Sequence, residues 1–374
     1  MLIGVPKEVK TQEYRVGLVP GSVRELAHHG HQIIVERGAG AGIGFEDAAY
    51  AAAGARLGSV EEVFAAAELI AKVKEPQPQE IKRLRPGQVL FTYLHLAADR
   101  AQTEGLLKSG ATCIAYETVT DARGGLPLLA PMSEVAGRMS IQVGAHCLEK
   151  EQGGLGILLG GVPGVASAKV AILGGGVAGT NAARVAMGME AYVTVIDNSL
   201  PRLYELDMRF GAQLHTLFAT MENIEREVLA ADLVIGAVLV PGAAAPKLVS
   251  REMVRGMKAG AVLVDISIDQ GGCFATSRPT THADPTFVEE GVIHYCVTNM
   301  PGAVARTSTF ALNNATLPFM LALAEKGWRR ALLDDPNLRA GLNVHQGHIT
   351  HAAVARDLGL PYVAPEDAIG RLEG

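Results

Sequence analysis

Three glycines and an acid stand in residues 169–197 at the spacing of a nucleotide-binding turn. The segment reads KVAILGGGVAGTNAARVAMGMEAYVTVID, with a β-branched run before Gly174, a helix-like stretch after Gly179 and a second strand that ends at Asp197. Gly174 allows a tight turn, Gly176 lets the backbone approach a pyrophosphate, and Gly179 lets the helix pack closely on the sheet. Asp197 follows Gly179 by 18 residues, near the spacing of about 20 at which an acid binds a ribose 2′-hydroxyl. The pattern predicts a dinucleotide site rather than a glycine-rich structural turn. The acid favours NAD over NADP, because it would repel a 2′-phosphate.

A nicotinamide cofactor transfers hydride, so the protein must supply groups that bind the substrate and move protons. In open α/β sheets such groups lie at the carboxyl ends of strands. His95 ends the run FTYLH, and an imidazole suits proton exchange with a carbonyl or carbinolamine oxygen, although a histidine there more often has a structural role. Asp269 follows the predicted strand Ala261–Ile268 and could orient water or ammonia, or compensate a charged neighbour. Asp265, inside the same predicted strand, is interpreted as a buried hydrogen-bonding residue.

Three further residues could bind a substrate or cofactor at strand ends. Lys74 lies in the run AKVKEP, at the end of a predicted strand. Lys72 lies on the same face of that strand, because side chains alternate, so the pattern alone does not choose between the two lysines. The proline just past Lys74 ends the strand and favours Lys74 as the residue at the edge of the sheet. The Lys74 ammonium could polarise a carbonyl or bind a carboxylate, with a solvated lysine as the alternative. Arg15, in a turn-rich loop after the first predicted strand, could hold a small carboxylate through two parallel hydrogen bonds, or form a surface ion pair with Glu13 or Glu8. The amide of Asn299 could bind nicotinamide or ribose, with a simple turn as the alternative.

Strands and helices alternate over the first 130 residues, which predicts parallel strands joined by crossover helices. The predicted strands are Leu2–Val5, Gln32–Glu36, Leu69–Val73, Val89–Leu94 and Thr112–Tyr116, and the predicted helices include Ser22–His29, Asp47–Ala53 and Val60–Ala66.

A long helix with Ser133 as its N-cap and an end near Glu151 is predicted next. Strands at 170–173, 192–196, 233–238, 261–268 and 293–298 then predict an open sheet around the glycine loop. A second long helix, 308–330, and two mostly helical segments complete the chain.

We therefore predict an α/β fold with two doubly wound Rossmann-like domains, separated by a cleft and connected by long helices. The substrate domain is discontinuous, residues 1–130 plus 306–374, and the NAD-binding domain spans 131–305.

Composition narrows the class of protein. The 374 residues are 48% hydrophobic and carry a net charge of −6, which gives no reason to expect nucleic acid or an anionic membrane as partner. Four scattered cysteines without C-x-x-C spacing indicate a reducing compartment and no zinc site. The start MLIGVPKEVK is not a signal peptide, and no apolar run is long enough for a membrane span. We expect a cytoplasmic protein.

Long motifs throughout the chain resemble the alanine dehydrogenase family, within a larger group that includes the nucleotide-binding subunit of proton-translocating transhydrogenase. They are VPKEVKTQEYRVGL (5–18), VKEP (73–76), FTYLHLA (91–97), APMSEVAGRM (130–139), LGGGVAGTNAA (173–183), GAVLVPGAAAPKLV (236–249), VLVDISIDQGGCF (262–274), SRPTTH (277–282) and VTNMPGAVARTST (297–309). The resemblance implies reversible, NAD-linked oxidative deamination of L-alanine to pyruvate and ammonium by a homohexamer.

The family's site residues carry over by matching motifs. His95 and Asp269 become the catalytic pair, and Arg15 and Lys74 bind the substrate in a site lined by Met132. The expected cofactor contacts, with the three glycines, are Ser133, Val177, Ala178, Asp197, Arg202, Val238, Leu239, Ile266, Ser267, Ile268, Asp269, Arg278, Val297, Thr298, Asn299 and Met300.

Two features depart from some relatives, at three positions. Ala219 stands where relatives can have a serine near the adenine, and Ala322 and Lys326 replace an acid and a histidine that can hold a divalent ion. We therefore expect no metal. Three rival interpretations remain open: the NAD-binding component of a transhydrogenase, another amino acid dehydrogenase such as one that forms or cleaves saccharopine, and a non-catalytic NAD-binding regulator.

Overall fold

The computed structural model describes residues 1–238 and 245–370. Leu239, one of the predicted cofactor contacts, lies outside the described residues. The chain forms two compact units, one made of Met1–Met132 and Val304–Gly374 and the other of Ser133–Ala303.

The first unit is built on one mixed sheet of eight described strands in the order β15-β14-β6-β5-β4-β1-β2-β3. The strands β1 to β6 pair in parallel, whereas β14 runs antiparallel to β6 and to β15. Their bounds are β1 Leu2–Val5, β2 Gln32–Glu36, β3 Arg56–Gly58, β4 Leu69–Ala71, β5 Val89–Thr92, β6 Thr112–Ala115, β14 Leu342–His345 and β15 His348–Ile349.

The order of the six parallel strands reverses between β1 and β4, because β2 and β3 lie on one side of β1 and β5 and β6 on the far side of β4. Such a reversal is a topological switch point, where open sheets bind their ligands. Apolar strands such as Leu69–Ala71 and Val89–Thr92 are buried along their whole length, as in a sheet covered by helices on both faces.

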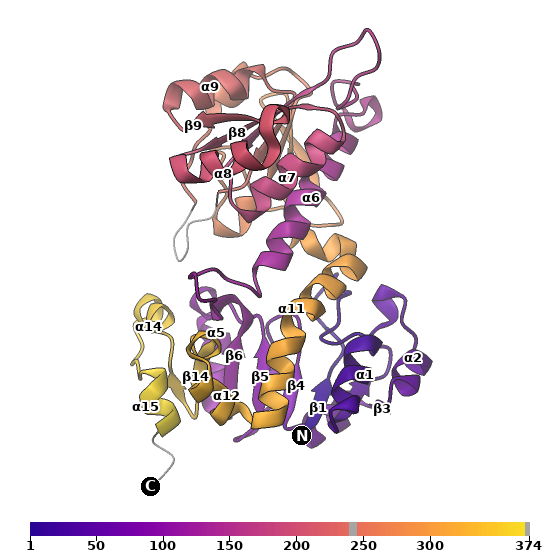
Figure 1. Ribbon diagram of the computed structural model, residues 1–374, viewed down its shortest axis with the longest axis vertical. Coiled ribbons are helices and arrows are strands. Elements are labelled where there is room, and N and C mark those ends of the chain that lie inside the picture. Colours follow the sequence, from indigo (N-terminus) through magenta and orange to yellow (C-terminus); the bar gives the residue numbers. More distant parts are fainter. Residues whose placement is uncertain (239–244, 371–374) are drawn as a thin grey trace. The chain divides into compact units, whose positions relative to one another are not determined.

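Helices of the first unit come from both ends of the chain, and Figure 1 shows α14 and α15, near the C-terminus, beside β14. Their bounds are α1 Pro20–His28, α2 Asp47–Ala52, α3 Val60–Ala66, α4 Pro78–Ile81, α5 Arg100–Ser109, α11 Ala305–Lys326, α12 Trp328–Asp334, α13 Pro336–Arg339, α14 Ala352–Leu358 and α15 Pro365–Gly370.

Two predictions for the C-terminal segment are wrong. The helix predicted over 308–330 is two helices, because Gly327 takes a left-handed φ of 74° between α11 and α12. The segment after it is not mainly helical. Residues 342–349 form the hairpin β14–β15, whose two turn residues Gln346 and Gly347 have φ of 44° and 81°, the geometry of a tight hairpin turn.

The second unit holds a sheet of seven strands within its described residues, in the order β12-β13-β11-β10-β7-β8-β9. All neighbours pair in parallel except β12 with β13. Read from β9 to β13, this is the doubly wound order 3-2-1-4-5-6, with its switch point between β7 and β10. The strands are β7 Lys169–Leu173, β8 Tyr192–Asp197, β9 His215–Phe218, β10 Leu233–Gly236, β11 Val262–Asp265, β12 Thr286–Glu289 and β13 Val292–Tyr295.

The helices of this unit are α7 Val177–Gly188, α8 Leu200–Phe210, α9 Met221–Ala230, α10 Arg251–Gly256 and most of α6 Ala130–Cys147. Figure 1 shows α7 and α8 next to β8 and β9.

The predicted N-cap role of Ser133 is wrong, because α6 begins at Ala130 and Ser133 lies inside it. The amide of Ala130 donates to Leu126 O at 2.9 Å, and Pro131, which lacks an N–H, suits a first turn. The helix ends at Cys147 rather than near Glu151, where a separate 3₁₀ turn, Lys150–Gln152, follows.

Several strands end earlier than their apolar runs predict. β11 ends at Asp265 rather than Ile268, because the Asp265 side chain accepts the Ser267 amide and starts the 3₁₀ helix Ile266–Gln270. β4, β5, β10 and β13 likewise stop two or three residues short of the predicted ends. Asp269 therefore lies in a 3₁₀ turn after the strand.

Candidate active site

The glycine loop joins β7 to α7, and two of its glycines leave no room for a side chain. Gly174 has φ of 100°, and a Cβ there would lie 2.6 Å from Ala237 O; a Cβ at Gly179 would lie 1.8 Å from Gly174 O. Gly176 is different, because a Cβ there would meet nothing within 4 Å. The loop is thus tight toward the protein and open at Gly176.

The first turn of α7 has no side-chain cap from the described residues, so its amides can bind an anion. Asp197, at the end of β8, accepts the Gly175 amide at 2.7 Å and the Ser199 amide at 2.8 Å. Arg202 donates to Gly175 O and to Thr180 Oγ1, both at 2.6 Å. The uncapped helix start and the open backbone offer N–H donors to a pyrophosphate, and the strand-end acid can accept from a ribose hydroxyl, so these residues fit a dinucleotide cofactor.

Apart from Ser133, the other predicted cofactor residues of this unit stand after the carboxyl ends of neighbouring strands. Ser267 follows β11 and its hydroxyl donates to Val238 O, after β10, at 2.7 Å. Asn299 follows β13 and has a left-handed φ of 61°. Val177 and Ala178 open α7, Ser133 lies on α6, Ile266, Ile268 and Asp269 share the 3₁₀ turn after β11, and Val297, Thr298 and Met300 lie after β13.

Arg278 and Asp265 have structural contacts. The Arg278 guanidinium stacks on the Phe287 ring at 4.0 Å. Asp265 is fully buried and accepts hydrogen bonds from the amides of Ser267 and Cys273 and from the Ser277 hydroxyl. It therefore organises the 265–277 loop, as a buried hydrogen-bonding residue was expected to do.

In the first unit, Arg15 and Met132 come together although 117 residues separate them. Arg15 Nη1 lies 3.2 Å from Met132 Sδ, and the guanidinium is 2% exposed. Glu13 accepts from Arg15 Nε at 2.7 Å and from Nη2 at 2.6 Å. The ion pair with Glu13, which was an alternative to a binding role, does form, but it is buried and fixes the plane of the guanidinium.

Lys72 and Lys74, between which the alternation of side chains could not choose a binding residue, have different environments. Lys72 is fully buried and donates to Glu8 at 3.1 Å and to Glu80 at 2.7 Å. Burial alone would lower the pKa of Lys72, but these carboxylates raise it. The Glu8 carboxylate also accepts the amides of Val73 and Lys74. Lys72 therefore has a structural role, and its partner Glu8 holds the backbone that carries half-buried Lys74.

His95 follows β5 in a left-handed conformation, with φ of 50°. Glu117, after β6, accepts the amides of Leu94 and His95 and so holds this turn. The imidazole stacks on the Tyr93 ring at 5.8 Å, and its Nδ1 lies 3.9 Å from Glu75 Oε2. Burial opposes a charged imidazole, but the acids around it raise the pKa of His95 above its usual value.

Arg15, Lys74 and His95 follow β1, β4 and β5, the strands at and beside the switch point of the first sheet. The rule that open sheets bind ligands at carboxyl strand ends thus applies to each unit separately. Asp269 belongs to the second unit, and its action together with His95 stays a prediction.

Comparison with known proteins assigns the chain to a family. Models of the N-terminal and C-terminal domains of alanine dehydrogenase/PNT match residues 4–136 and 140–352. The chain belongs to the alanine dehydrogenase/PNT family. It is 62% identical to alanine dehydrogenase of Halomonas elongata over 99% of this chain and 100% of that one. The Bacillus subtilis alanine dehydrogenase is 55% identical, over 99% and 98%.

Solved structures agree with this membership. A structure of L-alanine dehydrogenase superposes with a TM-score of 0.93, at 51% identity over 96% of this chain and 99% of that one. A transhydrogenase from Sinorhizobium meliloti superposes with a TM-score of 0.82, at 25% identity over 93% and 100%. The predicted α/β fold with Rossmann-like sheets is confirmed. Membership in the alanine dehydrogenase/PNT family implies an oxidoreductase with a nicotinamide dinucleotide cofactor.

Strand-end reasoning missed two carboxylates beside His95, Glu75 and Glu117. Glu75 and Glu117 follow β4 and β6, so the criterion that found Lys74 and His95 would also have found them. Glu13 was expected only as a partner of Arg15 at the surface, whereas the fold buries this pair.

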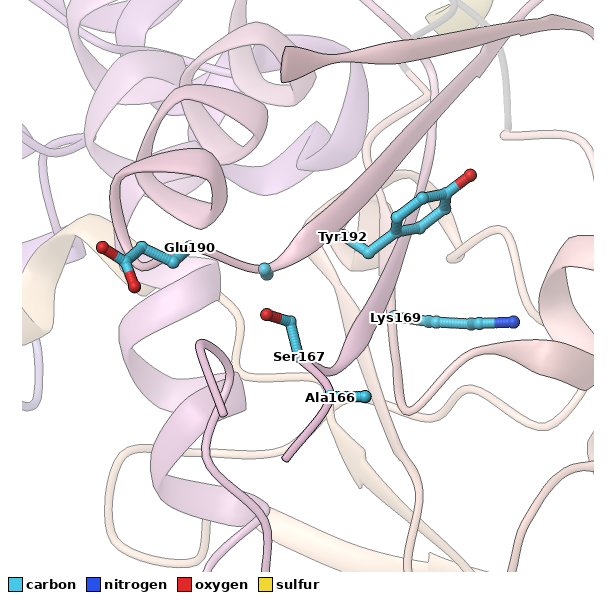
Figure 2. Close-up of a pocket in the computed structure, with 6 residues that line it drawn as sticks. Ala166, Ser167, Lys169, Glu190 and Tyr192 are labelled. Carbon is cyan, nitrogen blue, oxygen red and sulfur yellow. The ribbon is translucent and has the colours of Figure 1, made fainter. Parts of the chain in front are cut away.

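A surface depression is found away from the candidate site residues. A depression of about 420 Å³ is lined by Ala166, Ser167, Lys169, Glu190, Ala191 and Tyr192. Lys169 and Tyr192 begin β7 and β8, so it lies at the opposite end of the sheet from the glycine loop, and in Figure 2 the Glu190 side chain points away from those of Lys169 and Tyr192. Within residues 1–238 and 245–370, no helix could span a membrane and no three metal-ligating side chains gather. All four cysteines are buried free thiols.

Proposed function

We propose that this protein catalyses the reversible oxidative deamination of L-alanine to pyruvate and ammonium with NAD. The observation that carries the proposal is the placement of Arg15, Lys74 and His95 after three strands of the first sheet, in a chain of the alanine dehydrogenase/PNT family. A carboxylate-binding fork, an ammonium and an imidazole are the groups that a small 2-oxo acid requires.

NAD rather than NADP is proposed because of Asp197. Its two carboxylate oxygens already accept backbone amides at 2.7 and 2.8 Å, which holds the group next to the loop. A 2′-phosphate would meet this negative charge, whereas a ribose hydroxyl can donate to it. The bound cofactor would accept the hydride that leaves the α-carbon of alanine.

The side chains of the first unit are proposed to bind the substrate and to move its protons. Arg15, held in plane by Glu13, binds the substrate carboxylate, and Met132 lines the pocket beside it. Lys74 polarises the carbonyl oxygen of pyruvate. Loss of hydride from alanine leaves an iminium, and water adds to it to give a carbinolamine whose nitrogen carries three protons. His95 takes the hydroxyl proton as the C–N bond breaks and ammonia departs, and returns that proton when the reaction runs toward alanine. Asp269 is proposed to orient the water or ammonia that adds.

We further propose that the first unit binds substrate and the second binds NAD, in a cytoplasmic homohexamer without a metal. Family resemblance supports the hexamer, and the four free thiols suit a reducing compartment. Light scattering coupled to gel filtration measures the assembly, and a mass other than six chains would contradict it.

One assay separates the proposed reaction from its rivals. NADH oxidation is followed with pyruvate plus ammonium, with 2-oxoglutarate plus lysine, and with an NADP analogue as hydride acceptor. The proposal predicts a rate only with pyruvate plus ammonium, and a loss of about 10²–10⁴-fold in His95→Ala. Activity only with the NADP analogue would instead indicate a transhydrogenase component, and activity only with 2-oxoglutarate plus lysine another amino acid dehydrogenase.

A further inference from the structure

Glu75 stands beside His95 at the start of the loop that follows β4, and its carboxylate is largely buried, with 14% of the side chain exposed. One oxygen, Oε1, pairs with the Lys10 ammonium. The other, Oε2, is buried and accepts no hydrogen bond from the described residues. A buried carboxylate oxygen left in this state costs free energy, so its position requires a reason.

The imidazole of His95 lies next to this oxygen, with its Nδ1 3.9 Å from Oε2. The His95 side chain is 47% exposed, so its ring can shift within its own plane, and a shift of about 1 Å brings Nδ1 to hydrogen-bond distance of Oε2. Catalytic hydrogen bonds are often long before the substrate binds.

The rest of His95 is already fixed. Glu117 holds its backbone amide at 2.6 Å, and the ring lies over Tyr93, whose hydroxyl donates to Leu128 O at 2.5 Å. Backbone and ring plane are therefore set by the protein, and the contact at Nδ1 decides which ring nitrogen carries the proton.

We propose that Glu75 is the positioning residue for His95. Its Oε2 accepts the Nδ1 proton, so that Nε2 is the ring atom that exchanges a proton with the oxygen of the substrate. This inference rests on the proposed function, in which His95 is the acid–base group. The same arrangement of a carboxylate behind a histidine fixes the tautomer in catalytic triads.

The charges around the His95 ring show in which direction its pKa changes when the charge of Glu75 is removed. Glu75 and Glu117 raise the pKa of His95, and Lys74 lowers it. Burial alone would raise the pKa of Glu75, but His95, Lys74 and Lys10 hold it below its usual value, so the carboxylate stays ionised. Removal of its charge therefore lowers the pKa of His95.

The kinetic test uses Glu75→Gln, with Glu75→Asp as the variant that keeps the charge. Deamination needs a neutral imidazole, so the acid limb of the pH profile of kcat/KM moves to lower pH in Glu75→Gln, and kcat falls about tenfold or more, within the loss expected for His95 itself. In Glu75→Asp, the position of the acid limb and the value of kcat both return part of the way toward those of the wild type. The matched control is Glu104→Gln, which removes an equal charge from an exposed ion pair with Arg100 and keeps the wild-type profile.

A second measurement needs no turnover. The imidazoles are labelled with ¹³C at Cε1, the His95 signal is identified by its loss in His95→Asn, and its pKa is read by NMR titration. The inference predicts a lower pKa in Glu75→Gln than in wild type and Glu104→Gln. Equal pKa values and an unmoved acid limb overturn it. A shifted pKa in an enzyme inactive with pyruvate and ammonium supports the Glu75–His95 contact and contradicts the proposed function instead.

Discussion

Three single Gly→Ala changes, two in the glycine loop and one at the end of α7, have three different expected outcomes. At Gly179, the added Cβ would lie 1.8 Å from Gly174 O, more than an ångström short of the 3.0 Å that real Cβ atoms keep. The clashing atom belongs to the backbone and cannot rotate away, so helix α7 and the loop must separate. Overpacking of this kind costs about 1–3 kcal/mol, and we expect the upper end, which is a fall in melting temperature of about 6–12 °C for a unit of this size.

Gly188 and Gly176 are the matched controls. A Cβ at either position meets nothing within 4 Å. Gly188 lies in the last turn of α7, where alanine gains up to about 1 kcal/mol of helix propensity, so Gly188→Ala melts at or above the wild-type temperature. Gly176→Ala also keeps its stability, but its methyl group occupies the open side of the loop, so the Kd for NADH rises about tenfold or more, a loss of about 1.4 kcal/mol.

Thermal unfolding and NADH fluorescence titration measure the two effects independently. The reasoning predicts that Gly179→Ala loses stability and that Gly176→Ala loses only cofactor binding. Equal melting temperatures for Gly179→Ala and Gly188→Ala would refute the packing argument. Unchanged NADH affinity in Gly176→Ala would refute the assignment of this loop to the pyrophosphate.

Three further changes test the structure and the site. Lys72→Met leaves two acids buried without their cation and should cost about 3–5 kcal/mol in chemical denaturation, whereas Lys326→Met, which loses only an exposed pair with Asp334, should leave the transition in place. Arg15→Lys keeps the charge but loses the planar fork, so the KM for pyruvate should rise about 10- to 100-fold, as for hydrogen bonds of 1.5–3 kcal/mol to a charged group; an unchanged KM excludes Arg15 from carboxylate binding. Asp197→Ser should reduce the preference for NADH over NADPH in kcat/KM at least tenfold, and an unaltered ratio would show that Asp197 does not select the cofactor.

Local patterns predicted much of the parallel sheets. The bounds of β1, β2 and α3 match the predicted ones, because a turn residue or cap stands directly beside each apolar run. Predicted strands such as 69–73 and 89–94 were too long, since an apolar run does not show where the hydrogen-bonded ladder stops. The hairpin β14–β15 was missed because its strands are only four and two residues long and its stability depends on β6.

In the candidate site too, residues with a local sequence signal could be predicted, whereas contacts between distant residues could not. His95 and Lys74 could be found because polar residues at strand ends have a local signal. The Glu8–Lys72–Glu80 cluster could not, because Glu8 lies 64 residues from Lys72 and a buried lysine looks like a solvated one in a sequence. The contact of Arg15 with Met132 crosses 117 residues and came only from family resemblance.

The central claim is hydride transfer from the α-carbon of alanine to NAD, and isotope transfer tests it most directly. The protein is incubated with L-[2-²H]alanine and NAD, and the products are examined by mass spectrometry and NMR. The account predicts one deuterium at C4 of the nicotinamide of NADH for each pyruvate and each ammonium released. NADH that forms without deuterium, or alanine that is left unchanged while NAD stays oxidised, would contradict it.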